Sequence, residues 1–330
     1  MKQCEPRLMF PMRQAGKPAL LIPRYLMQLY TQRTFSQKFN VVFDWTRQNW
    51  RPLLKSVTFF LLPVSLLQPL GMVTMFSRLV GLAENEGADR LVEALGVGNI
   101  LLFLLSLILV LVGAILSQSL FFAQVKTTFI QHEDLSSFSM RRMWQAMRAC
   151  MGRVCVLTVA TIVAVLAVAG LFVTFAISLG SVVGEGIGML VFLLLCLLFF
   201  ILLPVYPAYM LTDDGFFTAV RRGCSLGWRT WWGVFSTTMV MGFLTSTLQG
   251  FTSAPFQIIQ MMQAALVGQI SSAGATTLQF MAYLSGVVMC FIQYLTPALM
   301  VLMLCVHYGH AVDKVEGYTV DHEIDDFENL

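Results

Sequence analysis

Six long apolar runs limit what this chain of 330 residues can fold into. At a rise of about 1.5 Å per residue, a helical run of this length crosses about 30 Å of hydrocarbon. The runs are residues 57–82, 97–123, 154–179, 187–211, 234–256 and 278–306. An unpaired backbone amide is costly in lipid, so each run is expected to be helical. The sequence therefore predicts an all-α, polytopic membrane protein with six transmembrane helices.

The composition agrees with this class. Hydrophobic residues make up 57% of the chain and charged residues 12%, and the mean hydropathy is +0.73. These values exclude disorder and most soluble folds. The net charge of +3 is too balanced to indicate nucleic acid as a partner. The seven cysteines contain no C-x-x-C pair, so neither a disulfide framework nor a zinc cluster is expected.

The basic residues are concentrated in the connections on one side of the predicted membrane. Ten Lys or Arg precede the first run, five lie between the second and third, three between the fourth and fifth, and one follows the sixth. The other two lie on the opposite side: Arg78 is near the end of the first run, and Arg90 is between the first and second runs. Because cytoplasmic loops carry the excess of Lys and Arg, both termini are predicted to be cytoplasmic.

Three basic segments also resemble one another in pattern. They are residues 39–55, 136–153 and 213–232, and each has an apolar stripe at helical spacing opposed by arginines. Each precedes a pair of apolar runs, which predicts three amphipathic interfacial helices and a threefold hairpin repeat. The alternative is that basic, Trp-bearing segments precede many membrane spans because Trp and Arg both favour the interface.

The two ends of the chain differ in charge. Residues 1–38 form a basic arm that we expect to lie in the cytoplasm and to attract anionic lipid headgroups. Residues 39–306 are the predicted transmembrane domain. Residues 307–330 form an acidic tail, expected to be cytoplasmic, which would be repelled by the same lipids or would pair with the basic arm.

One segment carries a family resemblance. Residues 202–235, LLPVYPAYMLTDDGFFTAVRRGCSLGWRTWWGVF, place a proline-containing span end before an acidic pair, an arginine stretch and a Trp-rich entry into the next run. This order resembles poorly characterised bacterial membrane families related to the membrane domain of some glycerophosphodiester phosphodiesterases, including the YciC-like family. The matching residues are Pro207, Asp213, Asp214, Ala219, Arg222, Ser225, Leu226 and Trp231. The resemblance implies a helical protein of the bacterial cytoplasmic (inner) membrane and no catalytic residues, and no stretch outside the runs could hold the phosphodiesterase barrel.

The candidate metal ligands follow the sixth run. His307, His310 and Asp313 are spaced by three residues and would share one face of a continuing helix, as metal ligands require. The competing interpretation is a solvated polar tail that ends the last helix. Because the strong His-E-x-x-His pattern is missing, we expect no metal and no cofactor.

The predicted function is that of a non-catalytic membrane scaffold or interaction component. The sequence shows no nucleophile and base pattern, no phosphate loop and no ionisable residue near the middle of a run. Its expected partners are the lipid bilayer and other membrane proteins or further copies of the chain. The alternative is a transporter or lipid-handling protein, with a polar path between proline-bent helices lined by Gln118 and Gln293.

Overall fold

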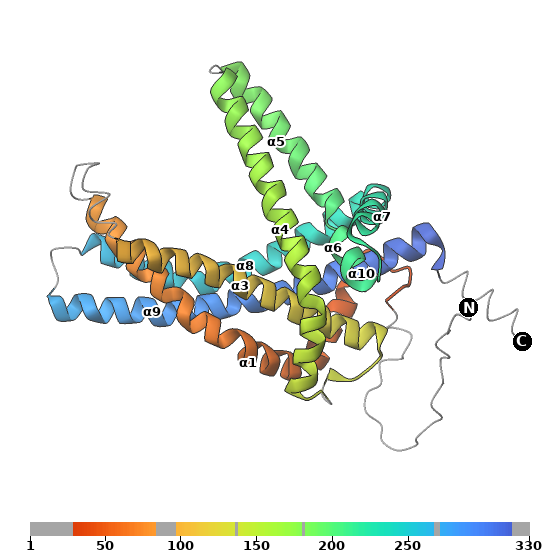
Figure 1. The fold of residues 1–330 in the computed structure, drawn as a ribbon, viewed down its shortest axis with the longest axis horizontal. Coiled ribbons are helices and arrows are strands. Elements are labelled where there is room, and N and C mark those ends of the chain that lie inside the picture. The colour runs from red at the N-terminus through yellow and green to blue at the C-terminus, as the bar shows by residue number, and fades with distance from the viewer. Residues whose placement is uncertain (1–28, 84–96, 136–137, 180–181, 267–270, 319–330) are drawn as a thin grey trace, which may run out of the picture.

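The computed structural model describes residues 29–83, 97–135, 138–179, 182–266 and 271–318, and the regular structure in these ranges is helical (Figure 1). The elements are α1 (Phe35–Ala83), α3 (Val97–Val125), a short π-helical turn η2 (Lys126–Ile130), α4 (Met140–Leu179), α5 (Val182–Leu202), α6 (Val205–Leu211), α7 (Phe216–Arg229), α8 (Trp231–Ala265), α9 (Ser272–Leu295) and α10 (Pro297–Glu316). The all-α prediction is confirmed for this part of the chain. Most of the basic arm and the last part of the acidic tail lie outside the described residues.

Five helical stretches of the described chain are long and apolar enough to cross a membrane. They are Phe35–Val73, Ile100–Ile130, Met140–Leu171, Gly188–Leu211 and Ala273–Glu316. This finding indicates a multi-pass membrane protein. The predicted run 234–256 lies within α8, which is not among the five because Thr, Ser, Gly and Gln interrupt its apolar residues. Six spans are therefore not confirmed.

The three basic segments do not take the same form. Residues 39–55 continue directly into the first apolar run within α1, and the second segment continues into the third run within α4. Only the third segment is a helix of its own, since α7 ends before Thr230 and α8 begins at Trp231. The described chain thus contains one separate helix of this kind rather than three, and the threefold repeat is not confirmed.

Prolines mark two breaks in the apolar helices. Pro204 lies between α5 and α6, and Pro297 is the first residue of α10, where its missing N–H leaves no hydrogen bond unmade. The predicted sixth run is therefore divided between α9 and α10. Moreover, α10 does not stop at Val306 but continues to Glu316, so the first residues of the predicted tail are helical.

The centre of the bundle is α10. Nine consecutive residues, 301–309, are buried. They make up more than two turns of helix, so every face of α10 is covered along this stretch. Around it lie α1, α3, α6, α7, α8 and α9. A helix that is apolar and covered all round forms the core of a bundle.

The hairpin of α4 and α5 is far more open. Figure 1 shows these two helices side by side, standing away from the layer of α1, α3, α8 and α9. Six consecutive residues of α4, 162–167, are exposed, which is more than a full turn of helix. Leu166 on α4 is 66% exposed and Leu194 on α5 is 58% exposed. The base of α4 nevertheless packs on the bundle, where Trp144 stacks on Phe60 of α1.

The described chain begins and ends at the same end of the bundle. The backbone N–H of Arg33 donates to Nδ1 of His310 at 3.0 Å, and Gly309 lies against the backbone of Leu29. The start of α1 therefore lies directly on the last turns of α10.

Candidate functional site

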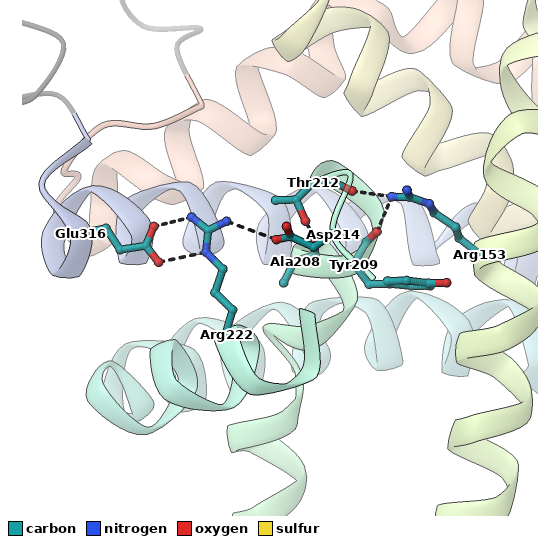
Figure 2. Close-up of polar contacts among 7 residues, drawn as sticks. All are labelled: Arg153, Ala208, Tyr209, Thr212, Asp214, Arg222 and Glu316. Carbon is teal, nitrogen blue, oxygen red and sulfur yellow. Dashed lines mark hydrogen bonds and ion pairs between the residues drawn. The ribbon is translucent and has the colours of Figure 1, made fainter. Parts of the chain in front are cut away.

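The corner between α6 and α7 holds the residues of the family-like segment, and an arginine from a distant helix fixes its first half (Figure 2). Arg153 of α4 donates from Nη1 to the carbonyl oxygens of Tyr209, at 2.9 Å, and of Thr212. Its Nη2 lies 3.7 Å from Asp213. The last carbonyls of a helix have no partner within that helix, and a guanidinium supplies the donors they lack. The base of the hairpin is thereby joined to the end of α6.

A second arginine fixes the other half of the corner. Arg222 of α7 donates from Nε to Glu316 at 2.9 Å and forms a second bond to the same carboxylate through Nη2, while Nη1 lies 3.6 Å from Asp214 (Figure 2). The hydrogen bond to Glu316 raises the pKa of the Arg222 guanidinium, with partial burial acting against it. Arg222 therefore stays charged and ties α7 to the last turn of α10 in the two-pronged geometry that arginine favours.

Three of the four buried residues of α7 are small. Ala219 and Leu226 are buried, and a side chain at Gly223 or Gly227 would collide with the backbone of the α5–α6 region. A Cβ at Gly227, for example, would lie 2.1 Å from the carbonyl oxygen of Ile201. These glycines let α7 lie directly on the backbone of its neighbours.

The structure thus brings together only part of the family-like set. Asp214 and Arg222 form an ion pair, Asp213 approaches Arg153, and Pro207, Ala219 and Leu226 are buried. Ser225 is exposed, and Trp231 stacks on Trp232 with ring centroids 4.2 Å apart. The described contacts of this corner are those of a structural joint.

The candidate metal ligands have other partners. Nδ1 of His307 lies 3.2 Å from Nζ of Lys38, and its Nε2 lies 3.4 Å from the hydroxyl of Thr230. The nearby His310 accepts its hydrogen bond from the Arg33 backbone, and the two imidazole centroids are 6.0 Å apart. Lys38 holds its ammonium against Nδ1, which favours a neutral imidazole that donates from Nε2. In the ranges that the structure describes, no three His, Cys, Asp or Glu side chains could hold one metal ion.

The described side chains around these histidines are more basic than acidic. His307 is 1% exposed and Lys38 4%, and a carboxylate, Asp313, is buried with them at 4%. Burial also lowers the pKa of the Arg33 guanidinium, whose Nη1 donates to the carbonyl oxygen of Leu29. Cations beside the imidazoles oppose the binding of another cation, so this cluster suits the joining of α1, α8 and α10 better than a metal.

The two residues of the proposed polar path differ in exposure. Gln118 is half-buried on α3, and Gln293 is exposed on α9. Other amides of the bundle pair across helices: Gln68 accepts from Tyr294 at 2.5 Å, Gln249 donates to Thr296 at 2.5 Å and Gln124 donates to Ser56 at 2.7 Å. Gln260 on α8 is an exception, since its buried amide oxygen and nitrogen have no hydrogen-bond partner among the described residues.

Several residues of these two clusters were missed by sequence reasoning. Arg153, Lys38, Thr230 and Glu316 each pair with a residue far along the chain; Lys38 and His307, for example, are 269 positions apart. No local pattern signals such a pair. The only signal in the sequence was that basic residues lie beside the apolar runs, which indicates that some of them need partners at the ends of the helices.

Comparisons with known proteins do not identify a relative: no protein-family model, no curated protein and no solved structure matches the chain. The resemblance to the YciC-like family therefore rests on residues 202–235 alone and stays a prediction.

Proposed function

We propose that this protein is a non-catalytic interaction component of the bacterial cytoplasmic (inner) membrane, and that the α4–α5 hairpin receives a transmembrane helix of a partner. The observation that carries the proposal is the exposure of α4 around its whole circumference at residues 162–167. Although the centre of the bundle at α10 is densely packed, the described residues leave this stretch of the hairpin uncovered.

The residues of α4 also fit helix pairing. Ala160, Ala164, Ala167, Gly170 and Thr174 lie within about 120° of the helix circumference, at about 100° per residue. We call these residues the small face of α4; the last four are exposed and Ala160 is half-buried. Lipid tails are as apolar as leucine, so helices associate in membranes by close packing, which small residues permit. The partner is a membrane protein or a second copy of this chain.

The placement of both termini in the cytoplasm is part of the proposal. It is supported by the basic residues Lys38, Arg153 and Arg222, which come from three different segments and take part in the contacts at the end of the bundle where α10 finishes. The excess of positive charge on one side is typical of the cytoplasmic face.

The test combines purification from native membranes with two matched variants of the full chain. The A164L/A167L variant fills the small face, and the control A169L adds the same side chain to an exposed alanine on the other side of α4. We expect a stoichiometric protein to co-purify with the wild type and with A169L, and its recovery to fall about tenfold or more for A164L/A167L. Thermal stability of the three purified proteins should be equal, because these positions are exposed in the part of the chain that the structure describes. Equal recovery of the partner from both variants, or no stoichiometric protein at all, would contradict the proposal.

A second candidate function, a transporter or lipid-handling protein, is favoured by one observation. Within the described ranges, the buried amide of Gln260 and the amide oxygen of Gln263 have no hydrogen-bond partner, and such groups usually have a protein, water or ligand partner. This function predicts a stoichiometric small molecule or lipid in the same purification, and its loss on replacing Gln260 with Leu.

A further inference from the structure

One face of α7 carries large exposed side chains of two kinds. Phe217 is 85% exposed and Trp228 is 70% exposed, and Arg221 between them is also exposed. At about 100° per residue, the three lie within about 40° of one another around the helix. We call Phe217, Arg221 and Trp228 the outer face of α7.

The outer face cannot turn inwards. The side of α7 that packs on the bundle holds Gly223 and Gly227, which lie against the backbone of Val205 and Ile201 so closely that no side chain fits between them. The two-pronged bond from Arg222 to Glu316 fixes the same helix to α10. The aromatic rings of the outer face are therefore held away from the bundle.

The position of α7 next to a candidate membrane span indicates that lipid headgroups surround it. The helix begins five residues after Leu211, where the candidate span Gly188–Leu211 ends. Directly after it comes α8, whose second residue, Trp232, is 66% exposed. A helix at the end of a membrane span lies at the level of the lipid headgroups, where Trp and Arg are both favoured.

The charges on α7 complement an anionic surface. Arg221 and Arg229 are exposed, and among the described residues neither forms an ion pair. Aromatic rings beside unpaired arginines match the boundary between acyl chains and phosphate groups better than they match the water around a soluble domain.

We propose that the outer face of α7 binds anionic phospholipids of the surrounding bilayer. Phe217 and Trp228 enter the upper part of the acyl region, and Arg221 and Arg229 pair with the lipid phosphates. The bilayer is the committed occupant because α7 follows the candidate membrane span Gly188–Leu211 closely and carries exposed aromatic rings beside exposed arginines. This inference does not rest on the partner of the α4–α5 hairpin.

The test uses the full chain in phosphatidylcholine bilayers with a rising fraction of phosphatidylglycerol brominated near the top of its acyl chains. Bromine quenches nearby tryptophan fluorescence, and the part of the quenching that W228F removes belongs to Trp228. We expect half-maximal quenching of Trp228 at a fraction of phosphatidylglycerol about 30-fold lower in the wild type than in R221Q/R229Q, from the usual attraction of two basic residues to an anionic surface.

The control R221K/R229K keeps both charges and should stay within about threefold of the wild type. All substituted residues are exposed, so the variants should fold alike, which a thermal melt checks. The proposal would be overturned if quenching of Trp228 in the wild type rose only in proportion to the overall fraction of phosphatidylglycerol in the bilayer, because Trp228 would then have no preference for the anionic lipid. So would the lack of any quenching of Trp228, which would place a protein partner over the outer face.

Discussion

Two apolar helices of this protein, α10 and α4, look alike in sequence and lie in opposite surroundings. Residues 301–309 of α10 are all buried, whereas residues 162–167 of α4 are all exposed. Both stretches are rich in Val, Leu and Ala or Met. Hydropathy thus reports that a helix avoids water and does not report whether protein or lipid replaces the water, because the two are equally apolar.

The largest expected difference between the two helices is the cost of removing a leucine. L302A on α10 should lower the free energy of unfolding by about 2–5 kcal/mol, because Leu302 is 0% exposed and its loss leaves a cavity. L166A on α4 should change it by less than about 0.5 kcal/mol, since Leu166 is 66% exposed. Unfolding of the purified protein by SDS titration measures both. Similar costs at the two sites would show that the hairpin packs on the bundle.

Glycines give the next comparison, between α4 and the contact of α1 with α3. A Cβ at Gly71 of α1 would lie 2.6 Å from the carbonyl oxygen of Leu102 and 2.6 Å from Cβ of Ser106, so G71A should cost about 1–3 kcal/mol. A Cβ at Gly170 of α4 would meet no other described part of the chain within 4 Å, so G170A should leave stability unchanged or raise it by up to about 1 kcal/mol through helix propensity. The same titration decides the sign, and a destabilising G170A would contradict the open hairpin.

The sequence predicted much of the fold and little of the site. The apolar run 97–123 lies within α3, and the run 154–179 lies within α4, because long stretches without charged residues are visible in the sequence. The burial of α10 could not be predicted, since it results from which helices surround it. For the same reason the tail beyond Val306 looked like solvated chain, although His307 and Tyr308 are fully covered.

The site depends on pairs that only the folded chain creates. Arg222 was marked by the family-like segment, but its partner Glu316 is 94 positions away. The acid and the arginine could each have been solvated, and nothing in their spacing joins them. The side of the membrane on which these pairs lie is still a prediction from the distribution of Lys and Arg.

The buried ammonium of Lys38, which α1 places against His307 of α10, sharpens the comparison further, because residues 154–179 of α4 carry no charged side chain. H307L removes the acceptor that faces the Lys38 ammonium and should cost about 1–3 kcal/mol. K38M removes the charge together with its need for a partner and should stay within about 1 kcal/mol of the wild type. The double variant K38M/H307L should recover most of the loss seen in H307L. If it is as unstable as H307L, Lys38 is not the group that His307 satisfies.

The smallest effect is expected where the hairpin's neighbour α7 meets α10. Arg222 and Glu316 are each about one-third exposed, with side-chain accessibilities of 32% and 37%, so solvent screens their attraction. A double-mutant cycle with R222Q and E316Q should therefore give a coupling free energy of about 0.5–1 kcal/mol, falling as salt is raised. R142Q, an exposed arginine at the start of α4, is the control and should show no coupling to E316Q. A coupling near zero for Arg222 would mean that the glycine contacts of α7 alone hold this helix in place. A value well above 1 kcal/mol would mean that the corner is shielded from water more completely than the exposure of its side chains indicates.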